Sequence, residues 1–184
     1  PLKVRKNKIA VYAGDEEGLA LAFAGDITGA WPDFNAAPDV AFRVEALTGY
    51  VASVTPRRIY SAGGDVSIDA IMRQLAGEMG LAYVNNGVSR SLIQPALSGG
   101  LYEQAYSVAR MADFELLLDD ESMVIQPWDA VRDADAEPPV WRDSTGVKGY
   151  PTFTQTGISV TGLYAPALVQ GGALRVESIV PKAS

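Results

Sequence analysis

The sequence predicts an α+β fold in which a β-barrel-like platform, built from both ends of the chain, carries a small α/β insert. Residues 1–60 and 145–184 show the alternation of apolar and polar side chains that is typical of strands. Between them, residues 61–127 contain two segments with helical spacing, each followed by a short apolar run. The acidic, proline-rich residues 128–144 are interpreted as the connection back to the platform.

Composition excludes several classes of protein. The chain has no cysteine and no histidine, so it cannot form disulfides, zinc sites of the Cys or Cys/His type, or a Ser-His or Cys-His catalytic relay. Its net charge of −7 disfavours binding to a phosphate backbone, which requires clustered Lys and Arg. No apolar run approaches the roughly 18 residues of a membrane-spanning helix. We therefore expect a globular protein without a membrane span or specific nucleic-acid binding.

The first 60 residues predict β structure. Strands are expected at Lys8–Ala13, Leu19–Ile27, Val40–Leu47, Tyr50–Val54 and Arg58–Ser61. Gly25-Asp26 is typical of a turn or bulge, because glycine weakens a strand and aspartate favours turns. A loop is predicted between Trp31–Asp33 and Ala37–Asp39, where prolines interrupt the alternation.

At residue 61 the apolar period changes from that of a strand to that of a helix. The first predicted helix has Ser67 as its N-cap and ends before Gly80. Its apolar stripe consists of Ile68, Ile71, Met72, Leu75 and Met79. A strand at Leu81–Val84 follows, and Asn85–Gly87 predicts a hairpin-type turn.

The same plan recurs 33 residues later, where Leu75-Ala76 aligns with Val108-Ala109. The second predicted helix is lined by Leu101, Ala105, Val108, Ala109 and Ala112. Asp113 stands at its end, and Phe114–Leu118 predicts the following strand. We interpret this as a doubled helix-strand unit, with Met123–Gln126 as its edge strand.

The C-terminal segment predicts two further strands joined by a wide connection. The apolar run Ile158–Val160 continues to Leu163-Tyr164, and Ala173–Ile179 alternates with a period of two. An alternating strand must bury one face and satisfy its backbone hydrogen bonds. We therefore expect Ala173–Ile179 to pair with the N-terminal strands, with Leu174 and Val176 pointing inward.

Several acidic and glycine-rich clusters could carry chemistry, but each has a simpler interpretation. Asp133, Asp135 and Glu137 alternate as calcium ligands can, yet the glycine and the twelfth-position glutamate of an EF-hand are missing, so a solvated loop is favoured. Carboxylates at Asp119, Asp120 and Glu121 could serve glycoside hydrolysis, but they lie on a predicted turn. Gly63-Gly64 and Gly99-Gly100 precede helices without a phosphate-binding motif.

Aromatic and hydroxyl side chains form the second group of candidates. Residues that could stack on sugars or anchor a partner are Trp31, Trp128, Trp141 and Tyr150, with packing at the edge of a core as the favoured alternative. Ser67, Ser144 and Thr145 have no histidine to activate them, and a Ser-Lys pair with Lys148 is disfavoured. We therefore expect no enzyme activity, no cofactor and no metal site.

Several motifs occur in an order that resembles a known family. Gly149-Tyr150-Pro151 is followed by Gly157-Ile158-x-Val160, then by Pro166 and by Gly171-Gly172 before the last strand. This order is similar to the closing segment of the tail hub proteins of long-tailed bacteriophages. The opening half agrees, since Asn7–Gly14, Phe23–Ile27 and Ala37–Val40 resemble the first barrel strands of that family.

The resemblance implies a structural role in the tail of a phage or prophage. It implies a baseplate hub that adapts the tail tube to the central spike, assembled as a homotrimer with tube and spike proteins as partners. Its place would be the virion, after assembly in the cytoplasm of the bacterial host. The motif residues expected to shape this fold are Gly149, Tyr150, Pro151, Gly157, Pro166, Gly171 and Gly172. The alternatives are a cell-envelope polysaccharide-binding module that uses the aromatic loops and, less favoured, a tail-associated hydrolase.

Overall fold

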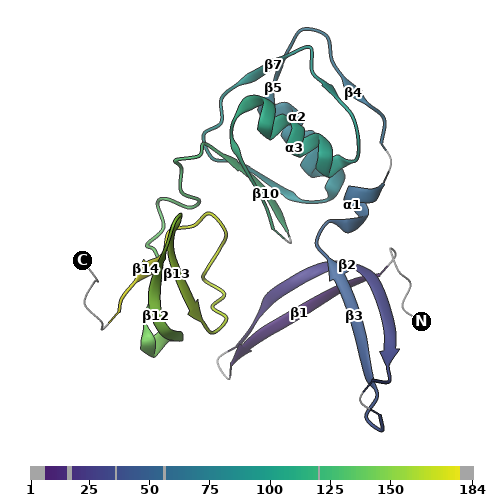
Figure 1. Cartoon of the computed structure of the whole chain (residues 1–184). Helices are drawn as coiled ribbons and strands as arrows, with labels where there is room; N and C mark the ends of the chain where they lie inside the picture. Colours follow the sequence, from purple (N-terminus) through teal and green to yellow (C-terminus); the bar gives the residue numbers. More distant parts are fainter. Residues whose placement is uncertain (1–6, 16–17, 36, 56, 120, 179–184) are drawn as a thin grey trace. The chain divides into compact units, whose positions relative to one another are not determined.

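The computed structural model describes residues 7–15, 18–35, 37–55, 57–119 and 121–178. The chain forms two compact units (Figure 1). Unit 1 comprises the chain up to Val11 together with Phe23–Ala130, and unit 2 comprises Tyr12–Ala22 together with the chain from Val131 onward. The elements are a mixture of strands and helices, as the sequence predicts for an α+β protein.

The N-terminal strands form a three-stranded sheet in the order β1-β2-β3. Its strands are β1 (Lys8–Asp15), β2 (Gly18–Asp33) and β3 (Ala41–Leu47). The three predicted strands are confirmed, but β2 runs unbroken through Gly25-Asp26 and includes Trp31–Asp33, because pairing with β3 extends it. The irregularity falls between Ile27 and Gly29 instead. In the described part of the chain this sheet is open, so the barrel-like platform stays a prediction.

The predicted strand at Tyr50–Val54 is wrong, because this segment forms the short helix α1 (Tyr50–Val54). Gly49 precedes it in the left-handed region, at φ 66°. The buried carboxylate of Asp26, on β2, accepts a hydrogen bond from the Val51 amide at 2.9 Å and so satisfies a donor at the start of the helix. A cap supplied from 25 residues away overrides the strand propensity of Tyr50 and the valines.

The segment predicted to form the α/β insert contains two helices and short strands. Its elements in chain order are β4 (Tyr60–Ser61), β5 (Asp65–Ser67), α2 (Ile68–Met79), β6 (Ala82–Asn85), β7 (Ser91–Ile93), β8 (Ala96–Leu97), α3 (Leu101–Ala112), β9 (Glu115–Leu118) and β10 (Ser122–Gln126). The helices α2 and α3 lie side by side in Figure 1 and pack against each other. The apolar positions predicted for them supply much of the core, including Ile71, Leu75 and Val108, each at most 1% exposed.

The predicted doubling of this segment is visible in the elements. Both helices have 12 residues and both predicted helix ends are confirmed, with Gly80 and Asp113 each in the left-handed region after the last turn. The small strands pair reciprocally, β4 with β8 and β5 with β7, both antiparallel. The short strands that precede one helix therefore pair with the short strands that precede the other helix.

Two predictions about the insert are wrong. Met123–Gln126 is not an edge strand, because β10 lies between β6 and β9 and all five of its residues are buried. Asn85–Gly87 does not form a hairpin, because β6 pairs in parallel with β10 while the next strand, β7, pairs with β5. Apolar strands of this length carry no sequence signal for a central position, which depends on what pairs on either side.

Unit 2 contains a hairpin and a small parallel pair of strands. Its elements are β11 (Val140–Trp141), the 3₁₀ turn η1 (Asp143–Thr145), β12 (Val147–Thr154), β13 (Gly157–Gly162) and β14 (Arg175–Val176). Strands β12 and β13 form an antiparallel hairpin, and β14 pairs in parallel with β11. The Tyr164 hydroxyl donates a hydrogen bond to the Leu21 carbonyl at 2.6 Å, which fastens the β1-β2 tip within the same unit.

The predicted pairing of Ala173–Ile179 with the N-terminal strands is wrong. The Arg175 amide donates to the Pro139 carbonyl and the Glu177 amide to the Trp141 carbonyl, both at 3.0 Å, so the connecting segment supplies the partner strand. Leu174 is 40% exposed rather than inward, and Ile179 lies outside the described residues. The sequence did not reveal β11, because two residues after a proline-rich run are too short for a periodic signal.

Candidate functional site

The register of β2 and β3 gives their sheet one apolar and one polar face. Directly paired residues of antiparallel strands point to the same side. The apolar sheet face consists of Ala30, Pro32, Phe42 and Val44. The opposite face carries Trp31, Asp33, Arg43 and Glu45, with an ion pair between Arg43 and Asp33. Phe42 is 61% exposed, so the apolar sheet face presents a large aromatic side chain to solvent.

The hairpin of β12 and β13 is divided in the same way. The apolar hairpin face consists of Val147, Phe153, Ile158 and Val160. The polar side of the hairpin consists of Lys148, Thr152, Thr154, Ser159 and Thr161. Phe153 and Ile158 are paired across the hairpin and are 67% and 60% exposed. An exposed apolar surface made of paired side chains is typical of protein interaction sites.

The motif residues of the sequence analysis shape the backbone around this hairpin. Gly149-Tyr150-Pro151 forms a bulge, because the register shifts between Lys148 and Thr152, and Gly149 has φ 73°. Gly157 begins β13 directly after the hairpin turn. The structure therefore places two of the motifs on one hairpin.

The remaining motifs form two successive turns. Pro166 follows Ala165, whose carbonyl accepts a hydrogen bond from the Leu168 amide at 3.0 Å, so proline occupies its preferred second position of a turn. Gly171 has φ 77° in the turn closed by the Gly172 amide and the Val169 carbonyl. Its own carbonyl accepts from the Arg132 amide at 2.8 Å. These residues hold chain geometry rather than presenting functional groups.

Among the acidic candidates, Asp119 stabilises the turn between β9 and β10. Asp119 accepts hydrogen bonds from the Glu121 amide at 3.1 Å and the Ser122 amide at 2.7 Å, which confirms the predicted turn, while Asp120 lies outside the described residues. Among the residues described, no group of three or more acidic side chains is arranged to hold a metal ion, and this includes Asp133, Asp135 and Glu137.

Neither glycine pair predicted to precede a helix forms a free anion site. The Gly100 amide donates to the Glu103 carboxylate at 3.0 Å, so a negative charge already lies where a phosphate would bind at the start of α3. Gly63-Gly64 leads into strand β5 rather than into a helix. Neither glycine pair therefore offers the amides that a phosphate requires.

The aromatic and hydroxyl candidates lie on separate elements. Trp31 is on β2, and Tyr150 lies in the β12 bulge. Trp128 donates a hydrogen bond from Nε1 to Asp113 Oδ1 at 3.0 Å. Trp141 is half-buried in unit 2. Thr145 Oγ1 accepts from the Arg142 amide at 2.8 Å and caps η1. Ser67 lies directly before α2, and Ser144 lies within η1. Lys148 lies on the polar side of the hairpin.

A family model described as baseplate hub gp41 matches residues 2–183. The chain belongs to the baseplate hub gp41 family. The match covers nearly the whole sequence, and it confirms the predicted tail hub family. The role of this baseplate hub family member is therefore structural and lies in a phage tail.

Two solved tail proteins are similar to this hub family member, and the first of them shares its fold. The tail protein from Neisseria meningitidis MC58 is 9% identical, with a TM-score of 0.51 over 93% of this chain and 61% of that chain. The 43 kDa tail protein of prophage MuSo2 from Shewanella oneidensis is 12% identical, with a TM-score of 0.44 over 89% of this chain and 53% of that chain. The chain thus spans 61% and 53% of the lengths of these two proteins. No curated protein sequence matches it.

A cleft of about 420 Å³ lies in unit 1 of the hub family member. Its lining residues include Lys8, Asp26, Val51, Glu78, Tyr102 and Asp119. Asp26 accepts the Val51 amide, Glu78 pairs with Arg57, and Asp119 closes the β9-β10 turn. These three carboxylates of the cleft therefore stabilise the fold through hydrogen bonds and an ion pair.

Among the helices of the described residues, none has the length and apolar character of a membrane span.

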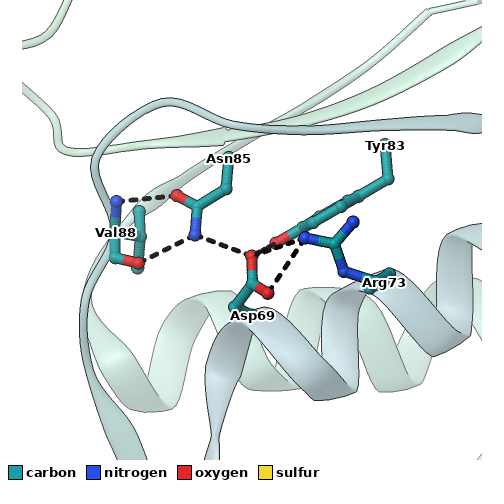
Figure 2. A network of polar contacts seen from close by, with 5 residues as sticks. All are labelled: Asp69, Arg73, Tyr83, Asn85 and Val88. Atoms are coloured by element: carbon teal, nitrogen blue, oxygen red, sulfur yellow. Dashed lines mark hydrogen bonds and ion pairs between the residues drawn. The ribbon is translucent and has the colours of Figure 1, made fainter.

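A polar network joins α2 to strand β6 and the loop after it (Figure 2). Asp69 Oδ1 accepts hydrogen bonds from Asn85 Nδ2 at 2.9 Å and from the Tyr83 hydroxyl at 3.0 Å. Arg73 lies one turn along the helix and forms an ion pair with Asp69 Oδ2 at 3.1 Å. Asn85 also exchanges hydrogen bonds with the backbone of Val88 at 2.8 and 2.9 Å. These hydrogen bonds hold the loop that follows β6, the segment for which a hairpin was wrongly predicted.

These hydrogen bonds shift two pKa values. The Asn85 hydrogen bond lowers the pKa of Asp69 against the opposing effect of burial, and Arg73 and Tyr83 lower it further. Burial and the Asp69 charge raise the pKa of Tyr83. This cluster was not among the predicted sites. Two features of the sequence could have indicated this cluster: an aspartate two residues after an N-cap, and the later Asn-Asn-Gly turn.

We expect Asp69→Asn to lower the free energy of unfolding by about 1 to 2 kcal/mol at pH 7, because it removes a charged acceptor from three donors. The Asp69 side chain is 35% exposed, so the effect is screened below that of a fully buried carboxylate. Because the pKa of Asp69 is lower in the folded chain, its contribution is present above the unfolded value of about 3.9 and is lost as the pH falls further.

Urea unfolding followed by circular dichroism at pH 7 and at pH 3 measures this difference. The difference between wild type and Asp69→Asn should shrink at the lower pH. Asp39→Asn, which changes an exposed carboxylate before β3, is the control and should alter stability by less than about 0.5 kcal/mol. An equal loss for both variants at pH 7 would contradict a stabilising role of the network.

Proposed function

We propose that this chain adapts a phage tail tube to the central spike as part of a trimeric baseplate hub. The observation that carries the proposal is the hub family match over residues 2–183. Tube and spike proteins are then its partners, and the virion baseplate is its location after assembly in the bacterial cytoplasm. Residues 1–60 with 145–184 act as the tube-like platform, and 61–127 act as the insert.

The surface supports assembly better than catalysis. Two uncharged apolar faces are exposed, on β2-β3 and on the β12-β13 hairpin, whereas Asp26, Asp119 and Glu103 are engaged in caps and turns. A net charge of −7 also suits a lumen through which DNA passes, because it repels phosphate. We therefore propose a role without enzyme activity.

Light scattering coupled to gel filtration tests the trimer. We expect a mass of three times the 19.5 kDa protomer at micromolar concentration, because the exposed apolar faces need cover. A mass of one protomer across the whole concentration range would contradict the proposal.

The second candidate is a polysaccharide-binding module, and the exposure of two aromatic rings favours it. Tyr150 is 69% and Trp128 65% exposed, and such rings can stack on sugars. A glycan array separates the candidates. Binding that is lost in both Tyr150→Ala and Trp128→Ala would support the module, whereas a trimer without glycan binding supports the hub.

A further inference from the structure

Asn86 is the one asparagine of this chain that is followed by glycine. The other asparagines, Asn7, Asn35 and Asn85, are followed by lysine, alanine and asparagine. Asparagine before glycine can convert to aspartate or isoaspartate without an enzyme, because glycine has no β-carbon to hinder the attack of its own amide nitrogen on the asparagine side chain. The sequence therefore singles out one position for this chemistry.

The backbone of Gly87 leaves the attacking nitrogen accessible. Gly87 lies in the bend after β6, is exposed and has φ 98°. The Asn86 amide donates to the Ile125 carbonyl, and the Val88 amide donates to the Asn85 side chain, both at 2.8 Å. Within the described part of the chain, the Gly87 amide donates no hydrogen bond. The nitrogen that has to react is therefore not held by a partner.

The side chain of Asn86 belongs to a set of hydrogen bonds centred on Gln126, which we call the Gln126 network. Asn86 Nδ2 donates to Gln126 Oε1 at 3.2 Å. Gln126 is 1% exposed, and its Nε2 donates to Glu115 Oε2 at 2.8 Å and to the Ala130 carbonyl at 3.2 Å. Carboxylate and carbonyl oxygens only accept, so Gln126 Nε2 has to face them and Oε1 has to face Asn86. The residue at position 86 therefore has to be a donor.

We infer that Asn86 is a site of spontaneous deamidation and that the reaction breaks the Gln126 network. The Gly87 nitrogen loses its proton and attacks Asn86 Cγ, a carbon–nitrogen bond forms, and the side-chain nitrogen takes up a proton and leaves as ammonia. Water then opens the five-membered imide at either carbonyl, which gives aspartate or isoaspartate. The hydrogen bond to Gln126 joins two neutral groups, so breaking it slows the reaction by no more than about tenfold.

The product places an acceptor where the Gln126 network requires a donor. The new carboxylate faces Gln126 Oε1, and turning the Gln126 amide places that oxygen against Glu115 and the Ala130 carbonyl instead. Either arrangement leaves buried polar atoms unsatisfied. Ala130 is the last residue of unit 1 before the chain enters unit 2. Deamidation therefore loosens the point at which the connecting segment leaves unit 1.

Peptide mapping of the full chain by mass spectrometry, after incubation at mildly alkaline pH, tests the site. Anion exchange separates the product, because deamidation adds one negative charge to the net charge of −7. We expect the modified fraction at Asn86 to grow with time while Asn7, Asn35 and Asn85 stay intact. Asn86→Gln, whose longer side chain would have to close a larger ring, should give no such species.

Two outcomes of the mapping overturn the inference. In the first, Asn86 stays intact in the folded chain and reacts only in urea, because the fold then protects it. In the second, Asn35 or Asn85 is modified as fast as Asn86, because the glycine then has no special effect.

Urea unfolding tests the consequence for the Gln126 network. Asn86→Asp should raise the equilibrium constant for unfolding about tenfold, as expected for buried unsatisfied groups. Asn35→Asp, the same change at an exposed position, is the control and should alter this constant by no more than about twofold. Glu115→Gln supplies a donor beside Gln126, so Gln126 can turn toward the new carboxylate.

The double variant Asn86→Asp/Glu115→Gln should therefore recover part of the stability that Asn86→Asp loses. Recovery supports the Gln126 network as the cause of the loss. An Asn86→Asp chain as stable as wild type, or a double variant whose losses simply add, overturns the claim that deamidation acts through Gln126.

Discussion

Ile125→Asp is expected to destroy the cooperative folding of the α/β insert. Ile125 is fully buried in β10, where it is paired with Leu116 of β9 and Asn85 of β6. An unpaired carboxylate at this position would lose its hydration without gaining a partner, at a cost of more than about 4 kcal/mol. Total stabilities of about 5 to 15 kcal/mol leave little margin for such a loss.

The matched control for Ile125→Asp is the same change on the neighbouring strand. Val84 lies on β6, at the edge of the sheet, and is 48% exposed. Val84→Asp should cost no more than about 1 kcal/mol, mainly through strand propensity. Urea unfolding followed by circular dichroism measures both variants. If Ile125→Asp unfolds at the same urea concentration as Val84→Asp, β10 does not occupy the centre of the sheet.

Gly162→Ala is expected to destabilise unit 2 by about 2 to 3 kcal/mol through overpacking. A Cβ atom at this position would lie 2.2 Å from Trp141 Cζ2 and 2.8 Å from the Gly146 carbonyl oxygen. The backbone of Trp141 is held by the β11-β14 pair, and Gly146 accepts a hydrogen bond from the Leu163 amide. The Gly146 carbonyl cannot move without disturbing this hydrogen bond, and the Trp141 ring would have to turn out of its half-buried position.

Two further variants identify the clash as the cause. Gly63→Ala is the control, because nothing lies within 4 Å of its added Cβ, and it should leave stability unchanged within about 0.5 kcal/mol. Trp141→Phe removes the ring atoms nearest to Gly162, so it should recover part of the loss when combined with Gly162→Ala. Thermal unfolding monitored by tryptophan fluorescence measures the series. A Gly162→Ala protein as stable as wild type would show that the ring packs elsewhere.

The helices of the insert were predictable because their signals are local. Twelve residues with apolar side chains on one stripe, bounded by Ser67 and Gly80 in α2 and by Asp113 in α3, specify a helix without reference to the rest of the chain. The motif order from Gly149 to Gly172 was also available from the sequence, and it led to the family. Where each of those residues would lie did not follow from it.

The candidate site could be predicted only in part. Ile158 and Ser159 are neighbours whose opposite faces follow from the strand period, so their separation was predictable. Which apolar residues of β12 join Ile158 was not, because the bulge at Gly149–Pro151 shifts the register between the two strands. The Asp69 network was missed for a similar reason, since it joins a helix and a strand whose pairing is with distant β10.

The sequence by itself determined the α+β class, the two helices with their ends, the strands β1 to β3 and the membership in a hub family. Tertiary structure decided that Tyr50–Val54 is a helix, that β10 is central and that β14 pairs with β11. Periodicity and capping act within a few residues and are written along the chain. A cap from Asp26, the partners on either side of a strand and the cover over a face come from residues far away in sequence, so only the folded chain specifies them.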